Sequence, residues 1–337
     1  MSPSAPIHCL VLVCPGFNMN ATMAFLDPFR AANYLDGQSY FRWTLASPEG
    51  GTCTASNGVT VETAALKTAV KDPADLVVVS ASWSPETYGT PALLGFLRQT
   101  ARRGITIAAL DTGAFLLAMA DLLNGRRATV HYEHIDALAE LYPEIDVTED
   151  LFVFDGPFAT CCGGSAATDF ALTMIRGMKG DALANAAARY LFHESVRPGQ
   201  TGQNPGTPEP LGRSAPQKLK EAVSLMERHL EDPLPITDLA RRVGLSPRQI
   251  ARLFRDHAGQ TPTGYYRDIR LDRARGLVTQ TELPMAEIAL AAGFASPIHF
   301  SRAYRARFGL PPSRDRQEGR IPFEFRAWPM HRPVREP

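Results

Sequence analysis

The sequence predicts two domains of different class, an α/β doubly wound domain followed by an all-α domain. Up to about residue 194, short β-branched runs alternate with helical patterns, which is typical of a mostly parallel sheet with helices on both faces. A stretch crowded with Pro and Gly, from Ser195 to Gly212, then breaks the pattern and predicts a linker. Beyond it, the segments up to about Gly319 have helical spacing and contain an internal repeat. A chain of 337 residues is long enough for two domains of ordinary size.

The first domain shows its elements in a regular β–α order. The run "ADLVVVSAS" (74–82) is continuously apolar and β-branched, which indicates a parallel strand covered on both faces. The segment "FATCCGGSAATDFALTMI" (158–175) predicts a strand, a Gly-Gly turn and a helix. The remaining expected elements are strands at 7–14, 42–48, 58–63 and 105–110, and helices at 20–35, at 91–102 and directly after Asp111.

Composition and charge narrow the class of protein. Apolar residues make up 45% of the chain, and no apolar run approaches the ~20 residues that cross a bilayer. The N-terminus lacks the pattern of a signal peptide, so we expect a cytoplasmic protein without a membrane partner. Residues 1–210 hold 13 Lys and Arg against 21 Asp and Glu, whereas residues 211–337 hold 22 against 14. This split indicates an acidic sensor or enzyme joined to a part that meets a polyanion.

The five cysteines show no zinc-type spacing. They are Cys9, Cys14, Cys53, Cys161 and Cys162. We expect reduced, mostly buried thiols, and the sequence predicts neither a metal nor a cofactor.

The second half contains a repeat in which residues of the same kind recur in the same order. Gly244 matches Gly293 at an offset of 49, and after one inserted residue the offset is 50. The matched pairs are Asp238-Leu239-Ala240 with Glu287-Ile288-Ala289, Ser246-Pro247 with Ser296-Pro297, Phe254 with Tyr304, Gly259 with Gly309, and Pro262 with Pro312. Each copy predicts a helix-turn-helix unit, with a left-handed Gly in the turn, a Ser N-cap and a Pro in the first helical position.

The second helix of each unit carries side chains suited to DNA. Arg and Gln make bidentate contacts with guanine and adenine edges, and further arginines bind phosphates. The stripe Leu271, Ala274, Leu277 and Val278 predicts one long helix that holds the units at fixed separation. Solvated arginine faces on a small helical bundle are the alternative. The predicted DNA-binding residues are Arg248, Gln249, Arg252, Arg255, Ile298, His299, Ser301, Arg302 and Arg305.

Two family resemblances follow from these motifs. The segment "IALAAGFASPIHFSRAYRARFGLPPSRDR" (288–316) resembles the signature of the AraC/XylS DNA-binding domain. The segments "MAFLDPFRAAN", "AALDTGAFLLAMADLLNGRRATVHYEH" and "FATCCGGSAATDFALTMI" resemble the PfpI-like, class I glutamine amidotransferase-like domain, which is flavodoxin-like. The combination resembles the GlxA group of regulators. The resemblance implies binding to promoter DNA, activation through RNA polymerase, and control of amino-acid or quaternary-amine catabolism.

Asp111 stands where enzymes of this fold carry a cysteine at a sharp strand-to-helix turn, and His131 stands where their histidine is expected. A carboxylate does not replace a thiolate, so we predict no catalytic residue. A helix N-terminus favours an ionised carboxylate, and aromatic faces attract ammonium groups. We therefore expect Asp111, with His131, Trp83, Phe17 and Tyr132, to bind an amine. The alternative is that Asp111 caps its helix, the aromatic residues pack and His131 is a hydrogen-bonded structural histidine.

The sequence thus predicts a transcriptional regulator, and the family resemblance names its expected partners. Its expected domains are a ligand-sensing domain (1–194), a linker (195–215), a DNA-binding domain (216–320) and a tail (321–337). The expected partners are promoter DNA, RNA polymerase, a small-molecule inducer and a second copy of the chain in a homodimer. The alternative function is a PfpI-like amidase or hydrolase fused to a DNA-binding domain.

Overall fold

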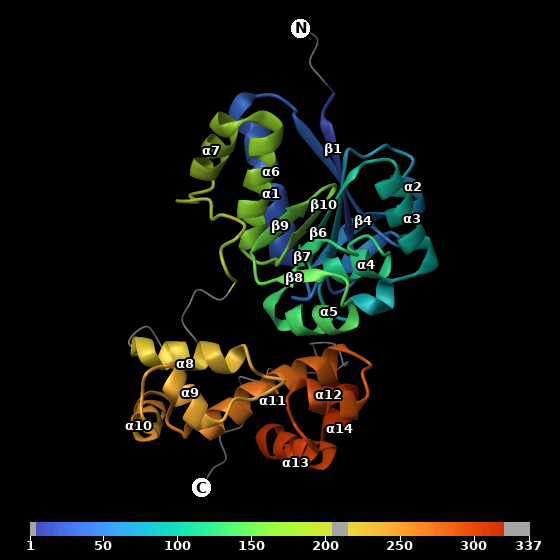
Figure 1. Ribbon diagram of the computed structural model, residues 1–337. Helices are drawn as coiled ribbons and strands as arrows, with labels where there is room; N and C mark the ends of the chain where they lie inside the picture. Colours follow the sequence, from blue (N-terminus) through green and yellow to red (C-terminus); the bar gives the residue numbers. More distant parts are fainter. Residues whose placement is uncertain (1–4, 204–214, 320–337) are drawn as a thin grey trace. The chain divides into compact units, whose positions relative to one another are not determined.

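The computed structural model describes residues 5–203 and 215–319. The chain divides into two compact units, an N-terminal unit of residues 1–203 and a C-terminal unit of residues 204–337 (Figure 1). Among the described residues, no helix combines the length and apolar character needed to cross a membrane.

The N-terminal unit is built on an eight-stranded, mostly parallel sheet. Its strands are β1 (Ile7–Val13), β2 (Phe41–Ser47), β3 (Gly51–Thr54), β4 (Thr60–Ala65), β5 (Leu76–Ala81), β6 (Thr106–Asp111), β9 (Phe152–Asp155) and β10 (Phe158–Cys161). They lie in the order β3-β4-β2-β1-β5-β6-β10-β9, and only the pairs β3–β4 and β9–β10 at the two edges are antiparallel. A separate parallel pair joins β7 (Arg127–Thr129) to β8 (Asp146–Thr148).

Helices cover both faces of this sheet (Figure 1). The α-helices are α1 (Met19–Asp36), α2 (Leu66–Ala69), α3 (Pro91–Arg102), α4 (Gly113–Met119), α5 (Ile135–Leu141), α6 (Ala166–Lys179) and α7 (Asp181–Tyr190). The helices α1, α6 and α7 pack together on one side, and α3 and α4 lie against β5 and β6 on the other. Successive residues of β1 are buried whichever face they point to, which explains its unbroken apolar sequence. The doubly wound prediction is confirmed.

The N-terminal unit extends beyond residue 194, where the sequence analysis places the start of the linker. Arg197 donates hydrogen bonds from its backbone N–H and its Nε to the buried carboxylate of Asp169, both at 2.8 Å. Gln203 donates from its side-chain amide to the backbone oxygens of Val130 and Asp150, at 2.9 and 3.1 Å. Gly199 lies in a turn, and its backbone oxygen accepts from the N–H of Leu151 at 2.9 Å. The rest of the predicted linker (204–214), and the predicted tail (321–337), lie outside the described residues.

The C-terminal unit is helical throughout its described range, as predicted. Its helices are α8 (Gln217–Glu227), α9 (Ile236–Arg242), α10 (Pro247–Ala258), α11 (Pro262–Gln280), α12 (Met285–Ala291), α13 (Pro297–Phe308) and α14 (Pro312–Gly319). A core cluster joins α8, α9, α10 and the first half of α11, with Leu219, Leu239 and Phe254 fully buried. The long helix predicted between the repeats is α11.

Candidate nucleic-acid interface and candidate ligand site

The sequence repeat corresponds to two structurally similar helix-turn-helix units, α9–α10 (HTH1) and α12–α13 (HTH2). The turn glycines Gly244 and Gly293 have φ angles of +70° and +69°, a region that favours glycine. Ser246 caps α10 in a capping box, because its hydroxyl accepts from the N–H of Gln249 while Gln249 Oε1 accepts from the N–H of Ser246. The predicted matching cap at Ser296 differs, since that side chain makes no cap hydrogen bond. The extra residue of HTH2 lies in this turn.

The helices α10 and α13 divide their side chains between the core and solvent as the spacing predicts. Ile250 and Phe254 on α10, and Phe300 and Tyr304 on α13, are almost completely buried. The predicted DNA-binding side chains are exposed, apart from the partly buried Ser301. Gln249 retains its amide N–H₂ for a base edge, because the capping box occupies only the oxygen.

Five outward arginines of α10 and α13 differ from Arg275 and Arg307, which pair with carboxylates inside the C-terminal unit. Among the described residues, none of the predicted reading arginines forms an ion pair with a carboxylate; they are Arg248, Arg252, Arg255, Arg302 and Arg305. In contrast, Arg275 binds the buried Asp315 at 2.9 Å, and Arg307 binds Asp268 at 2.7 Å. Arg275 and Arg307 are therefore neutralised within the unit, while the five predicted reading arginines have no carboxylate partner within the described chain, as the predicted contacts with phosphates and base edges require.

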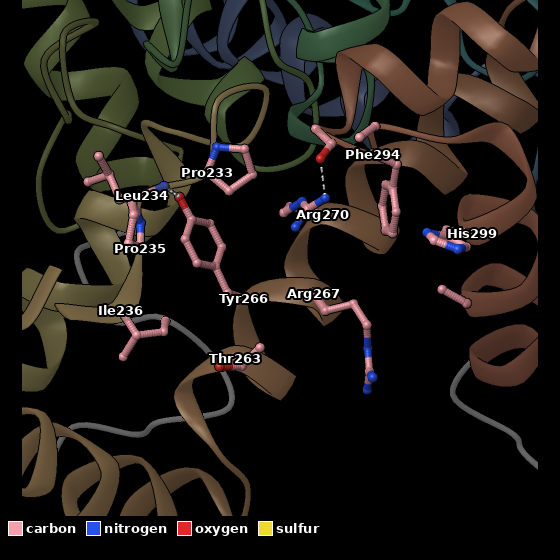
Figure 2. A pocket seen from close by; sticks show the side chains of 13 residues that line it. Pro233, Leu234, Pro235, Ile236, Thr263, Tyr266, Arg267, Arg270, Phe294 and His299 are labelled. Carbon is pink, nitrogen blue, oxygen red and sulfur yellow. Dashed lines mark hydrogen bonds between the residues drawn. The ribbon is translucent and has the colours of Figure 1, made fainter. Parts of the chain in front are cut away.

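Helix α11 fixes HTH1 and HTH2 relative to each other through two side chains four residues apart. Tyr266 donates its hydroxyl proton to the backbone oxygen of His229 at 2.6 Å and accepts from the N–H of Leu234. Arg270 donates from Nε to the backbone oxygen of Ala292 at 2.8 Å, and its guanidinium lies over the ring of Phe294. Figure 2 shows both side chains on the same stretch of α11, Tyr266 toward the HTH1 side and Arg270 toward the HTH2 side.

A cavity of about 510 Å³ lies along this part of α11 (Figure 2). Its walls come from the loop before α9, from α11, from the turn of HTH2 and from His299 and Ala303 of α13. At its edge the backbone of HTH2 closely approaches the chain that precedes HTH1. A Cβ atom on Gly293 would lie 2.3 Å from the backbone oxygen of Leu230 and 2.8 Å from that of Glu231. HTH1 and HTH2 are therefore parts of one packed body.

In the N-terminal unit, Asp111 lies at a strained turn between β6 and α4. Its φ angle is +58°, a conformation that costs a non-glycine residue roughly 1–3 kcal/mol. Two glycines allow the turn. A Cβ on Gly113 would lie 2.3 Å from the backbone oxygen of Val79, and one on Gly163 would lie 3.0 Å from Cβ of Asp111. The predicted sharp turn is present, with the carboxylate at its apex.

Burial decides the electrostatics of Asp111. The residue is 3% exposed, and this desolvation raises the pKa of its carboxyl from the ordinary 3.8 to about 6. The electrostatic effect of His131 and a hydrogen bond from Asn18 oppose the rise. The amide of Asn18 donates to Asp111 Oδ2 at 2.7 Å, while Asn18 Oδ1 caps α1 by accepting from the N–H of Ala21. The sequence analysis missed Asn18, although an Asn directly before a helical pattern is a recognisable capping signal.

The three aromatic residues predicted to act with Asp111 differ in how far they are buried. Trp83 is partly buried and lies against the turn at Gly16, 3.8 Å from the position of a Cβ there. Tyr132 is 51% exposed and its ring packs 4.6 Å from that of His131. Phe17 is 0% exposed and belongs to the core. A ligand contact by Phe17 would require its ring to leave this core packing, and the contact stays a prediction.

Two clusters of polar groups lie in the same unit. His131, Glu133 and His134 lie on and directly before a short 3-10 helix, η2 (Tyr132–His134). Burial lowers the pKa of His134 to about 3, so its imidazole is neutral. Asp169 is fully buried and accepts from Arg197, and its Oδ1 lies 2.7 Å from His193 Nε2. Asp169 thus holds the segment that follows α7, a structural role.

Comparison with known proteins gives two family matches. Residues 10–177 match the DJ-1/PfpI family, and residues 239–318 match a helix-turn-helix domain. The HTH-type transcriptional regulator CdhR of Pseudomonas aeruginosa is 42% identical over 90% of this chain and 90% of its own length. The chain belongs to the AraC-type transcriptional regulators that carry a DJ-1/PfpI domain. The regulator GlxA of Rhizobium meliloti is 37% identical over 89% of this chain and 93% of its own length.

Solved structures agree with this assignment. An AraC family transcriptional regulator from Pseudomonas putida covers 55% of this chain and all of its own, at 25% identity and a TM-score of 0.50. The predicted family and fold class are confirmed, and the chain is a DNA-binding transcriptional regulator. The individual ligand-binding and DNA-binding residues stay predictions.

Proposed function

We propose that this regulator is controlled by a small nitrogenous metabolite, an amino acid or a quaternary amine, bound without chemical change in the N-terminal unit. Bound ligand favours one state of the chain and thereby changes transcription at promoter DNA, a shift that requires different affinities for two states. We further propose that it acts in the cytoplasm as a homodimeric activator that contacts RNA polymerase. The observation that carries the ligand proposal is the buried carboxylate of Asp111 at a strained turn.

A cationic ligand suits this carboxylate for a physical reason. Desolvation makes the ionised form of Asp111 unfavourable, as its raised pKa shows, and the hydrogen bonds from Asn18 and from the backbone of Thr112, together with the electrostatic effect of His131, offset this only in part. A quaternary or primary ammonium group beside the carboxylate offsets this cost, because opposite charges interact strongly where water is excluded. Tyr132 and Trp83 supply partly exposed aromatic faces in the neighbouring loops.

The hydrolase alternative lacks an activated cysteine among the described residues. All five cysteines are buried and free of disulfides. Cys161 is close enough to Asp111 to be affected by its charge, and burial together with Cys162 holds the pKa of the Cys161 thiol well above its ordinary value. A thiol in this state is protonated and weakly nucleophilic. The similar proteins named above are transcriptional regulators, which favours binding over catalysis.

For DNA, we propose that α10 and α13 read base edges in successive major grooves with the exposed side chains predicted from the sequence. The supporting observation is that the five predicted reading arginines of these helices form no ion pair within the described chain, whereas Arg307, at the end of α13, pairs with Asp268. His299 and Ile298 extend the same surface of α13, and Ile298 is 65% exposed. An exposed isoleucine beside arginines suits contact with a thymine methyl group.

Isothermal titration of the full-length chain tests the ligand proposal. The panel contains glycine betaine, carnitine, arginine and glutamate, and we expect at least one cationic or zwitterionic amine to bind. Asp111→Asn should weaken that binding at least ~10-fold, whereas Asp121→Asn, a change in an exposed carboxylate, should leave it unchanged. Equal affinity in wild type and Asp111→Asn, or turnover of an amide that requires Asp111, would overturn the proposal.

A further inference from the structure

Three potential metal ligands gather at η2. One ligand atom each from His131, Glu133 and His134 lies within 4.8 Å of the other two. His131 Nδ1 lies 3.7 Å from Glu133 Oε2. These residues follow β7 and stand near the turn at Asp111, whose carboxyl is affected by the charges of His131 and Glu133. The cluster therefore joins two imidazoles and a carboxylate beside the proposed ligand site.

His134 gives a second and independent observation. Its side chain is 8% exposed, and its ring packs edge-on against Phe115, at 6.1 Å between centroids, and against His131 at 6.2 Å. Within residues 5–203 and 215–319, no hydrogen bond of this ring is formed. Within the described chain the mostly buried imidazole of His134 thus has ring contacts but no side-chain hydrogen bond, which leaves a ring nitrogen available as a ligand. Its ligand atom faces those of His131 and Glu133.

The distances fit a small cation with limited rearrangement. Metal–nitrogen bonds of about 2.0–2.1 Å in a tetrahedral site place neighbouring ligand atoms roughly 3.4 Å apart. The pair His131–Glu133 is already close to this spacing at 3.7 Å. The wider separations, up to 4.8 Å, close by rotation of His131 and Glu133, whose side chains are 28% and 39% exposed. His134 stays in place as the fixed ligand.

We propose that His131, Glu133 and His134 bind one divalent transition-metal ion, with Zn²⁺ as the favoured species. Two imidazoles and one carboxylate are borderline ligands of the type that zinc takes, and they leave at least one coordination position open. This site goes beyond the proposed amine response, because it requires neither Asp111 nor an organic ligand. It also revises the expectation from the sequence, which considered metal binding only through cysteine spacing.

Cobalt spectroscopy on the full-length chain tests the site. The protein is prepared without an affinity tag, stripped with a chelator and titrated with Co²⁺, whose visible absorption reports tetrahedral nitrogen and oxygen coordination. We expect one Co²⁺ per chain, displaced stoichiometrically by Zn²⁺. His131→Ala and Glu133→Gln should each weaken binding by ~10-fold or more, because each removes one of three ligands. Circular dichroism confirms that both variants fold.

Matched controls separate this site from adventitious binding. His299→Ala removes an exposed imidazole of the C-terminal unit, and Glu62→Gln removes an exposed carboxylate of β4. Both controls should keep the wild-type stoichiometry and affinity. The proposal fails if the wild type binds no Co²⁺ at ~100 µM, or if His131→Ala and His299→Ala bind it equally well. Because the cobalt titration contains no amine, its outcome does not depend on whether the ligand proposal is correct.

Discussion

Replacing Asp111 by Asn should stabilise the regulator at neutral pH while removing its proposed ligand response. The folded chain raises the pKa of this carboxyl from the ordinary 3.8 to about 6, chiefly by burial. Each pH unit of such a difference corresponds to ~1.36 kcal/mol. Keeping Asp111 ionised in the folded chain at pH 7 therefore costs about 3 kcal/mol, which asparagine avoids while still accepting a hydrogen bond from Asn18.

The sign of the pH dependence follows from the direction of the pKa shift. A carboxyl with a raised folded pKa binds more protons in the folded than in the unfolded state. Its favourable contribution is fully present below pH 3.8 and is lost as the pH rises through about 6. The stability difference between Asp111→Asn and wild type should accordingly grow by about 2 kcal/mol between pH 4.5 and 7.

Urea unfolding of both full-length proteins, followed by tryptophan fluorescence in chelator-treated buffer, measures this difference. Trp43 and Trp83 lie in the N-terminal unit, so the signal is dominated by the unit that contains Asp111. Using the difference between variant and wild type cancels the pH dependence of other carboxyls, such as Asp155, whose pKa is lowered. A difference that stays constant between pH 4.5 and 7 would refute the reasoning.

Three further predictions concern the C-terminal unit. Arg302→Ala should weaken specific promoter binding by ~1–3 kcal/mol if it contacts a base edge, whereas an equal loss on random DNA in fluorescence anisotropy would indicate a phosphate contact. Gly293→Ala should lower the melting temperature and DNA affinity more than Gly244→Ala. Both positions have a positive φ, but only at Gly293 would the added Cβ lie 2.3 Å from another backbone atom, the oxygen of Leu230; equal effects in calorimetry would contradict this. Tyr304→Phe should destabilise the unit by ~1–3 kcal/mol in thermal unfolding, since it leaves the buried Asp315 without a hydrogen bond of 2.6 Å; a neutral effect would show that water or Arg275 replaces it.

Sequence patterns predicted those parts of the fold that depend on local periodicity and on turn residues. The apolar run of β5, the strand-to-helix turn at Asp111 and both glycine turns of the HTH units follow from such signals. The antiparallel edge strands β3 and β9 do not, because edge pairing depends on which segments meet in space. The bond from Asn18 to Asp111 joins residues 93 positions apart, and no local pattern carries that information.

The linker boundary shows why composition alone is a weak guide. Pro198 and Gly199 lie in a segment whose composition predicts a linker, yet the N–H of Leu151 donates to the backbone oxygen of Gly199 at 2.9 Å. The anchor of this segment is Asp169, whose role becomes visible only once Arg197 is placed beside it. The metal-ligand geometry at His134 was missed for a related reason, since the sequence gives no measure of whether an imidazole is buried.

If α10 and α13 read DNA as proposed, the close packing at Gly293 fixes the distance and the angle between them. Because neither can slide independently, the pair presents a single pitch and phase to the duplex. A one-base-pair insertion between half-sites would rotate the distal one by roughly a tenth of a turn, and the helix would have to twist or bend to restore the match. The regulator would then distinguish promoters by the flexibility of base pairs that it does not contact, as well as by the base sequences that α10 and α13 contact.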